Sequence, residues 1–567
     1  MSAGDGTSPD PGSSAPHAAC RGPGEEAGRI GRRSVLAAAG TVTAAVFTSR
    51  VLGLIRESLF AALFGAGKFA DAFVLAFRIP NLLRELLAEG SMSSAFVPTF
   101  TLALTRDGRD RAHHLANLLM SGLMLITGLL AVLGIVFAAA IVDVMAPGFG
   151  EDPHKRALAI SAARIMMPFL PLITCAAAVM GMLNAQRRFF LPAVAPAMFN
   201  VVCIIVGVIL WMRDTPPDRA VLGWSVGAVI GAAVQFGVQV PPLYRLGWRF
   251  GPTIRGFFAD EGIRRIGRLM GPAVVGLAAV QINILVNSIF ASNLGDGPMA
   301  QLNYAWRLFY LPLGLFGVAI ATVTTTTVAE EAARGDHVAL RNRLAHALKL
   351  TWMLTVPSAI GLMAVSVPAI CLIYQRGAFG AEDTRATAYI LIAYAVGLAP
   401  YSSIKMVAPA FYALDRPRVP MCASIVAVLV NVTFNALTYR KLGAVGLATG
   451  TALGAIANIT ILIVSLRVLI GSMRGQGLLP AATRIVTASV LTGGVAFGLW
   501  WAVDRGWAGV GEGFWITGLG RVLRLLVPAG AGVAVYVAAC RVLRLQEIAE
   551  LTGPLARRLR RRPETRG

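Results

Sequence analysis

The sequence predicts an all-α protein that crosses a membrane many times. Apolar residues make up 56% of its 567 residues, charged residues only 14%, and the mean hydropathy is +0.67. Average soluble domains carry about 25% charged residues, so this composition excludes an ordinary soluble protein. Apolar runs of about 20 residues or more, each long enough to cross a hydrocarbon core of about 30 Å as a helix, recur along the chain. We therefore expect a polytopic fold of about fourteen transmembrane helices.

The apolar runs follow one another in order, each ended by charged residues or by proline and glycine. The expected spans are 34–64, 72–102, 113–145, 157–185, 190–212, 219–247, 263–293, 300–329, 340–374, 384–412, 418–438, 443–470, 483–503 and 522–545. Several runs exceed twenty residues, so we expect these helices to tilt or to project beyond the hydrocarbon layer. Residues 1–33, rich in Gly, Ser and Pro, are expected to form a disordered cytoplasmic tail.

Arginine is unevenly distributed among the connections between spans, and this distribution predicts the orientation. The connections after even-numbered spans are rich in arginine, including Arg106, Arg249 and Arg341, whereas the alternate connections carry most of the acidic loop residues. Basic connections face the cytoplasm, so an even number of spans places both termini inside. The net charge of +22 therefore reflects topology, and we expect no nucleic-acid partner. The basic C-terminal tail, 546–567, is expected to contact anionic membrane lipids.

A weak internal repeat, offset by about 230 residues, divides the spans into two lobes. The matching positions are 60–65 and 290–295, Arg78 and Arg307, and 184–187 and 412–415. Six spans separate the copies, so both halves keep the same orientation in the membrane. Parallel repeats of this kind are typical of transporters whose substrate binds between the repeats. The expected domains are an N-lobe over 34–247, a C-lobe over 248–471 and two further spans over 472–545.

Several arginines lie inside the predicted spans, where inserting a charge costs roughly 2.5–3.5 kcal/mol and therefore indicates function. They are Arg50, Arg56, Arg78, Arg84 and Arg307, and the nearby acids are Glu57, Glu85 and Glu89. The bases outnumber the acids, and the planar guanidinium group suits phosphate. We therefore expect a phosphorylated or diphosphate ligand between the lobes. An alternative is that these arginines, Arg78 and Arg84 above all but also Arg56 and Arg307, reach the membrane interface or pair with the neighbouring glutamates.

The first two spans carry a long, ordered motif. Its parts are SRVLGLIRE at 49–57, FGAG at 64–67, ADAF at 70–73, PNLLR at 80–84 and AEGSMSSAFVP at 88–98. This motif resembles that of the MurJ (MviN) family of lipid II flippases, and the resemblance extends from about residue 34 to residue 545. It implies the multidrug/oligosaccharidyl-lipid/polysaccharide exporter fold, with a groove for the lipid tail between the last two spans, in the bacterial cytoplasmic membrane.

The resemblance also implies roles for individual residues. The positions that match the family's substrate-binding arginines, which hold the diphosphate-sugar headgroup, are Arg50, Arg56, Arg84 and Arg307. Asp71 and Glu89 match acids associated with gating or activity, and Arg78 is grouped with them. Many members carry acids beside the last of the arginines, where this chain has Trp306 and Tyr310.

Some members bind sodium through an Asp in the seventh span and an Asn/Asp pair in the eleventh. The corresponding candidate ligands here are Asn431, Asn435 and Thr451, with Gln281, Asn283 and Asn287 in the seventh span. Neutral amides bind a cation weakly, since hard cations prefer charged oxygens. Coupling to sodium and coupling to the membrane potential are both open, and no other cofactor is expected.

The implied function is transport rather than catalysis. The substrate is lipid II, a polyprenyl-diphosphate-linked peptidoglycan precursor, moved to the outer leaflet by alternating access for cell-wall synthesis, with other cell-wall synthesis proteins as expected partners. One alternative is a flippase for another polyprenyl-linked oligosaccharide. A multidrug or cation antiporter of the same superfold is another, although its site would need carboxylates. A glycosyltransferase would need paired carboxylates or a metal site in longer connections.

Overall fold

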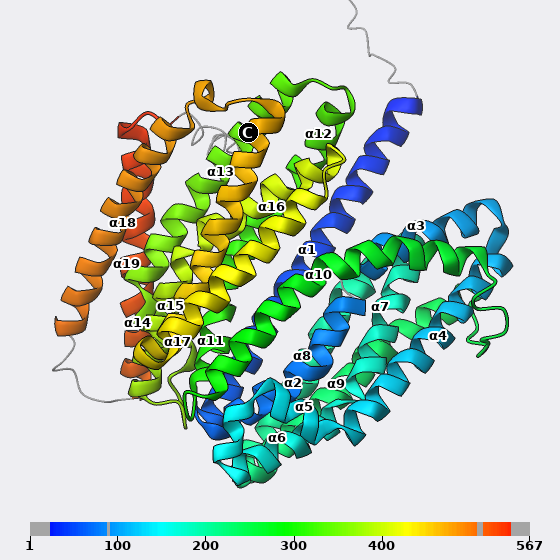
Figure 1. Cartoon of the computed structure of the whole chain (residues 1–567), viewed down its shortest axis with the longest axis horizontal. Helices are drawn as coiled ribbons and strands as arrows, with labels where there is room; N and C mark the ends of the chain where they lie inside the picture. Colours follow the sequence, from blue (N-terminus) through cyan, green and yellow to red (C-terminus); the bar gives the residue numbers. More distant parts are fainter. Residues whose placement is uncertain (1–22, 88–90, 507–513, 546–567) are drawn as a thin grey trace, which may run out of the picture.

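The computed structural model describes residues 23–87, 91–506 and 514–545. Within these ranges the chain is helical and no strand is assigned. Ten helical segments of the described residues are long and apolar enough to cross a membrane, so the chain is a multi-pass membrane protein (Figure 1). The predicted all-α membrane fold is confirmed. The ten segments do not establish the predicted number of fourteen spans.

Helices α1 to α9 form the N-lobe. Their bounds are α1 Pro23–Phe64, α2 Lys68–Leu87, α3 Ser91–Arg106, α4 Gly108–Val136, α5 Ala138–Met145, α6 Pro153–Met166, α7 Phe169–Ala185, α8 Phe190–Met212 and α9 Pro217–Arg245. Helix α1 begins at Pro23, so it includes part of the segment up to residue 33 that was predicted to be a disordered tail. A proline is well tolerated at the first position of a helix. Residues 1–22, Glu89 and the tail 546–567 lie outside the described ranges.

Helices α10 to α17 form the C-lobe, and two more helices follow it. Their bounds are α10 Glu261–Ser292, α11 Pro298–Pro312, α12 Val318–Ala333, α13 His337–Ala364, α14 Ser366–Tyr374, α15 Ala381–Val396, α16 Leu398–Ala413, α17 Arg418–Ile470, α18 Leu478–Gly506 and α19 Phe514–Val542. A single π-helical turn, Leu313–Gly317, joins α11 to α12. Helices α18 and α19 pack against each other and against α13 and α14, at the left edge of Figure 1.

The two lobes contain the same turn at the positions that the sequence repeat pairs. Arg187 follows α7 and Asp415 follows α16, and both adopt a left-handed φ, of 58° and 54°. Residues other than glycine rarely adopt such a φ. Its presence at both paired positions supports the internal repeat.

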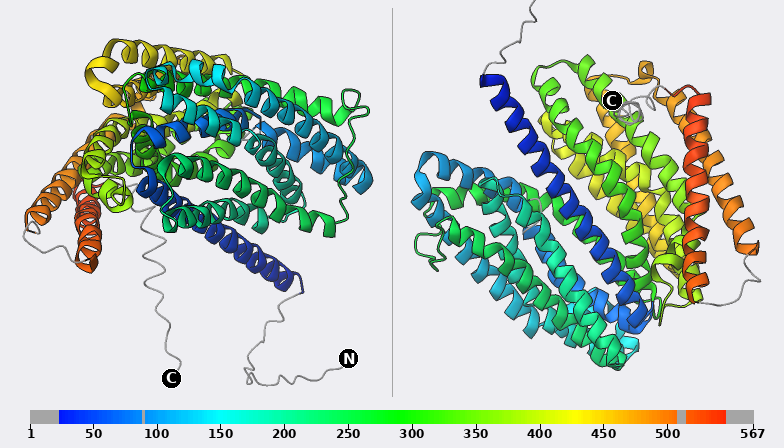
Figure 2. Two further views of the ribbon diagram at one scale, coloured as in Figure 1. Left: turned by 90° about the horizontal axis from the view of Figure 1, so that it is seen from below. Right: turned by 180° about the vertical axis from the view of Figure 1, so that it is seen from behind.

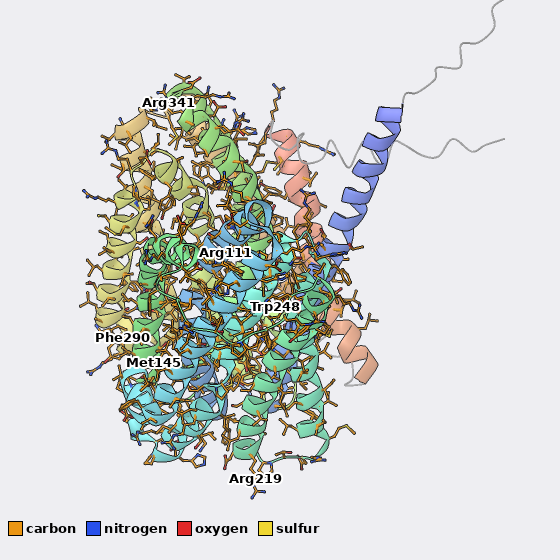
Figure 3. All side chains as sticks on the ribbon, turned by 90° about the vertical axis from the view of Figure 1, so that its right-hand side faces the viewer. Arg111, Met145, Arg219, Trp248, Phe290 and Arg341 are labelled. Atoms are coloured by element: carbon orange, nitrogen blue, oxygen red, sulfur yellow. The ribbon has the colours of Figure 1, made fainter. Side chains whose placement is uncertain are left out.

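The lobes meet at one end of the molecule and diverge toward the other, with α1 and α10 between them (Figures 1 and 2). Helix α10 packs against α3 of the N-lobe and against α17 of the C-lobe. Arg341 and Arg219 lie at opposite ends of the molecule (Figure 3), as the predicted alternation of connections requires. We call the end that contains Arg341 the inner end, and the end that contains Arg219, where the lobes meet, the outer end.

Helix α17 is two helices that meet at Gly443. A straight helix of its 53 residues would be about 80 Å long at 1.5 Å per residue, far longer than a bilayer is thick. Gly443 breaks the helix with φ 57° and ψ −143°, a conformation that is readily open only to glycine. The two arms of α17 coincide with the predicted spans 418–438 and 443–470.

The variant Gly443→Ala is therefore expected to lower the free energy of unfolding by about 1–3 kcal/mol, because a Cβ strains this backbone conformation. A fall in the melting temperature of the purified protein in detergent would measure the effect. Gly361→Ala is the matched control, because Gly361 lies inside helix α13 with open space where a Cβ would be added. Equal melting temperatures for the two variants would contradict the assignment of Gly443 as the corner.

Candidate functional site

Glu57 on α1 lies between two arginines that belong to different lobes. Its carboxylate accepts a hydrogen bond from Arg56 and lies 2.9 Å from Nη2 of Arg307 on α11. The side chain of Glu57 is 8% exposed and that of Arg56 is 12% exposed, so both are largely shielded from water. Two guanidinium groups share one carboxylate, and this leaves an excess of positive charge.

Arg307 keeps hydrogen-bonding capacity for a second anion. Its side chain is 40% exposed, and its Nε atom is buried without a hydrogen-bond partner among the described residues. The guanidinium carbon of Arg56 lies 5.2 Å from the centroid of the Phe199 ring, a cation–π contact that helps to orient the guanidinium plane. The exposed part of the Arg307 guanidinium can therefore accept an anionic ligand such as phosphate, whereas Arg56 is largely shielded in this conformation.

Arg50 lies further toward the inner end of α1, about 9 Å from Arg56 along the helix axis. Its side chain is exposed and approaches the π-helical turn of the C-lobe. A Cβ placed on Gly314 would lie 3.8 Å from both terminal nitrogens of Arg50. The structure thus brings three of the predicted binding arginines, Arg50, Arg56 and Arg307, to the surfaces on which the lobes face each other.

Arg78 and Arg84 lie on α2. Arg78 contacts α10 directly, whereas Arg84 is connected to α10 only through Glu85. Arg78 donates a hydrogen bond to Ser288 on α10. The guanidinium of Arg84 lies 3.7 Å from Glu85, and Glu85 accepts a hydrogen bond of 2.6 Å from Gln281 on α10. The alternative of pairing with a neighbouring glutamate therefore describes the geometry of Arg84, and also that of Arg56 beside Glu57, while Arg78 donates to a neutral hydroxyl.

Aromatic residues occupy the positions beside Arg307 at which many family members are expected to carry acids. Trp306 packs against tyrosine rings of α15 and α16, and Tyr310 is half-exposed. The acid nearest to Arg307 is instead Glu57 of the opposite lobe. Lys405 places its Nζ atom 5.7 Å from the centroid of the Tyr310 ring and adds a further cation. Lys405 gives no signal in the sequence, because it is the only charged residue of α16 and lies outside any motif.

Asp71 on α2 closes the outer end of the molecule. It is 1% exposed and accepts hydrogen bonds of 2.8 Å from the backbone N–H groups of Gly297 and Ala300. These groups lie at the start of α11, so a side chain of the N-lobe caps a helix of the C-lobe. Asp71 therefore joins the two lobes at this end, and its gating role stays a prediction.

Lys155 at the start of α6 completes this closure. Its Nζ atom lies 2.9 Å from Asp71 and 2.9 Å from Asp296, and it donates a hydrogen bond of 3.1 Å to the Gly295 carbonyl. The side chain is only 3% exposed. The sequence gives no signal for Lys155, because a single lysine just before a span is usually an exposed residue of the connecting loop.

The lobe backbones also touch at the outer end. The N–H of Ala378 donates to the Ala62 carbonyl at 2.8 Å, and the Tyr304 hydroxyl donates to the Gly65 carbonyl at 2.9 Å. At Gly297, which has φ 102°, a Cβ would lie 2.1 Å from the Ala66 carbonyl oxygen, so only glycine permits this approach. We call these contacts, together with those of Asp71 and Lys155, the outer seam.

The candidate sodium ligands lie together in the C-lobe. Asn431 and Asn435 come from the first arm of α17 and Thr451 from the second, and Asn283 and Asn287 of α10 join them. All five side chains carry neutral oxygens. In the part of the chain that the structure describes, no group of three or more His, Cys, Asp or Glu residues is placed to hold a metal ion.

At the inner end, α10 is attached to the N-lobe by an ion pair between Asp260 and Arg111. Nη1 of Arg111 lies 2.7 Å from Oδ2 of Asp260, and Oδ1 of Asp260 caps α10 by accepting a hydrogen bond from the N–H of Ile263. Partial burial favours the protonated form of Asp260, but the hydrogen bonds from Arg111 and Ile263 outweigh it and lower the pKa of the carboxyl group. Asp260 is therefore ionised at neutral pH, and the attachment is maintained.

A two-lobed helical membrane protein with a closed outer end and inter-lobe arginines belongs to the class of alternating-access transporters, and its site suits an anionic ligand. The family model for "Lipid II flippase MurJ" matches residues 60–516. The chain is 32% identical over 472 residues to the lipid II flippase MurJ of Burkholderia cenocepacia, covering 83% of this chain and 90% of that protein. The chain therefore belongs to the MurJ lipid II flippase family.

Other relatives agree with this assignment over nearly the whole chain. A probable lipid II flippase MurJ of Bdellovibrio bacteriovorus is 31% identical over 514 residues, covering 90% of this chain and 96% of that protein. A solved structure of lipid II flippase MurJ in an inward closed conformation matches with a TM-score of 0.71 at 25% identity, covering 91% of this chain and 99% of that one.

A more distant structural relative confirms the expected exporter fold. An inward-facing multidrug resistance MATE transporter of the MOP superfamily matches with a TM-score of 0.56 at 18% identity. The match covers 77% of this chain and 95% of that one. At this identity the likeness concerns the fold alone.

The variant Lys155→Met is expected to destabilise the protein by about 3–5 kcal/mol, because it leaves Asp71 buried without its cationic partner. Melting temperature and chemical unfolding would measure the loss. The double variant Asp71→Asn/Lys155→Met removes both charges and is expected to be more stable than Lys155→Met alone.

The neighbouring ion pair between Arg156 and Asp143 provides the control. Both of its side chains are well exposed, so Arg156→Gln is expected to cost at most about 1 kcal/mol. A Lys155→Met protein as stable as Arg156→Gln would contradict a role for Lys155 in the outer seam.

Proposed function

We propose that this chain flips lipid II across the bacterial cytoplasmic membrane by alternating access. Its membership of the MurJ family supports lipid II as the substrate. The structural observation that carries the proposal is the convergence of Arg56 and Arg307, from opposite lobes, on the single carboxylate of Glu57. A diphosphate that bound there would contact both lobes at once.

The diphosphate of lipid II suits this cluster in charge and in geometry. A guanidinium group binds phosphate oxygens through two parallel hydrogen bonds, and such charge-assisted bonds are roughly twice as strong as neutral ones. A phosphate can bind the exposed part of the Arg307 guanidinium, and its buried Nε atom, which has no hydrogen-bond partner among the described residues, would become available if the side chain shifted. A headgroup that enters from the inner end meets Arg50 first, since Arg50 lies nearer that end of α1.

The outer seam determines how binding is coupled to opening. To open the outer end, the protein must break the cap of Asp71 on α11, the ion pairs of Lys155 and the hydrogen bond between Ala378 and Ala62. A ligand shifts such an equilibrium only by its difference in affinity for the two states. A diphosphate held by both lobes stabilises the state in which the inner halves of the lobes approach each other. If the lobes move as rigid bodies, this movement separates their outer ends and works against the contacts of the outer seam.

The polyprenyl tail is expected to remain in the lipid while the headgroup crosses. The last two helices, α18 and α19, stand outside the C-lobe and pack against α13 and α14. We place the tail beside these helices, as the family resemblance implies.

We propose that the membrane potential resets the empty transporter. Without a substrate, the arginine cluster carries excess positive charge. An inside-negative potential is worth about 2.3 kcal/mol for each charge moved through 100 mV, and it favours the conformation in which the cationic site faces the cytoplasm.

We also propose that both termini lie in the cytoplasm, on the basis of the arginine-rich inner connections. The basic C-terminal tail would then contact anionic lipids of the inner leaflet. Enzymes that make or consume lipid II are proposed as partners on chemical grounds alone.

The arginines would recognise the diphosphate rather than the sugar. Another polyprenyl-diphosphate oligosaccharide is therefore the second candidate substrate, and selectivity between the two must come from contacts to the sugar and peptide. A cation antiporter is disfavoured, because Glu57 is already neutralised by two arginines.

Arg56→Gln and Arg307→Gln are each expected to weaken lipid II binding about 10- to 100-fold, since a hydrogen bond to a charged group contributes about 1.5–3 kcal/mol. Binding to the purified protein and complementation of a flippase-depleted strain would measure the effect, with protein levels checked. Arg385→Gln, which removes an exposed arginine of α15, is the control. Full complementation and unchanged binding by both site variants would refute the proposed site.

A further inference from the structure

Five side chains join α10 to both arms of α17 inside the C-lobe. They are Asn283 and Asn287 of α10, Asn431 and Asn435 of the first arm, and Thr451 of the second arm. Asn431, Asn435 and Thr451 are buried. We call this group the asparagine cluster.

Asparagines of the asparagine cluster donate hydrogen bonds to other members of the cluster, while the Thr451 hydroxyl donates to the Leu447 carbonyl at 2.9 Å. The amide nitrogen of Asn431 donates to Asn283, and that of Asn435 donates to the oxygens of Asn287 at 2.8 Å and of Asn431 at 2.6 Å. The amide nitrogen of Asn287 donates to the Thr451 hydroxyl at 3.1 Å. Amide N–H groups therefore already engage the side-chain oxygens of every member except Asn435, although these oxygens would have to converge on a cation.

A sodium ion does not fit this arrangement. The Oδ1 atom of Asn435 is buried without a hydrogen-bond partner among the described residues, but it faces the backbone of Gly450. A Cβ on Gly450 would lie 2.2 Å from this oxygen and 2.8 Å from the oxygen of Asn431, so the second arm fills the space in front of both atoms. No member of the cluster carries a negative charge that would offset the desolvation of an ion.

We propose that the asparagine cluster replaces a sodium site by a neutral, hydrogen-bonded clasp that holds α10 on α17 without any ion. The clasp itself is independent of what the protein transports. Its consequence for transport, that flipping does not require sodium, rests on the proposed function.

The position of α10 shows why such a clasp matters. Its inner end is attached to the N-lobe through Asp260 and Arg111, and its middle is attached to the C-lobe through the asparagine cluster. A sodium-dependent attachment would be released whenever the ion left. A clasp made of side-chain hydrogen bonds keeps α10 on α17 without depending on an ion.

The test compares melting temperatures of the purified protein in sodium, potassium and choline chloride at equal ionic strength. We expect the same melting temperature in all three salts. Asn435→Ala removes donors from the clasp, and we expect it to lower the melting temperature equally in all three. A saturable rise in the wild-type melting temperature with sodium alone, or an unchanged melting temperature for Asn435→Ala, would overturn the proposal.

A gain-of-function variant provides the matched control. Asn283→Asp/Asn435→Asp places two carboxylates in the asparagine cluster, and we expect its melting temperature to be low in choline and to rise saturably with sodium. Asn435→Asp alone serves the same purpose if the double variant fails to fold. Variants that fold but do not respond to sodium would count against the proposal, because they would show that amide neutrality is not what excludes the ion.

Flipping assays in proteoliposomes separate this proposal from the proposed function. Lipid II flipping that continues without sodium supports the clasp, and flipping that stops when sodium is removed overturns it. If the wild type flips no lipid II in any salt, the proposed function fails, while the melting temperatures still decide whether the clasp exists.

Discussion

The sharing of Glu57 by Arg56 and Arg307 is the interaction on which the site depends. An arginine shielded from water needs an anionic partner, and here one carboxylate of the N-lobe serves an arginine from each lobe. The arrangement is neutral enough to exist in a membrane and still basic enough to attract a phosphorylated headgroup. Because the shared carboxylate lies where the lobes face each other, any anion that competes with Glu57 also acts on the distance between the lobes.

The outer seam balances this site. It combines a buried ion pair, a helix cap across the lobes and backbone contacts that glycine permits, and all of these belong to the closed outer end. The seam needs to be strong enough to keep the empty transporter closed on the outside, yet weak enough to yield to a bound diphosphate. In the proposed cycle, Asp71 and Lys155 hold the outer end closed and must separate when it opens.

The sequence was most informative where a charged residue lies within an apolar segment. The composition predicted the fold class, and arginines within apolar spans pointed to Arg50, Arg56 and Arg307, which the structure places where the lobes face each other; their binding role stays a prediction. Lys155 gave no such signal, because its partner Asp71 lies 84 residues away and only the packing of α6 on α2 brings them together. The extension of α1 to Pro23 was missed because helices can continue beyond the apolar run that identifies a span. The sequence also could not predict that the asparagines hydrogen-bond to one another, because residue type does not specify which amide nitrogen faces which oxygen.

The central claim is that a diphosphate bridging the lobes opens the outer end. Spin labels at Arg219→Cys on α9 and Glu382→Cys on α15, both exposed near the outer end, would report the distance between the lobes after the native cysteines are replaced. Lipid II is expected to shift the distance distribution toward longer values in this background and to leave it unchanged when Arg307→Gln is added. An unchanged distribution without Arg307→Gln, or the same shift with it, would contradict the account.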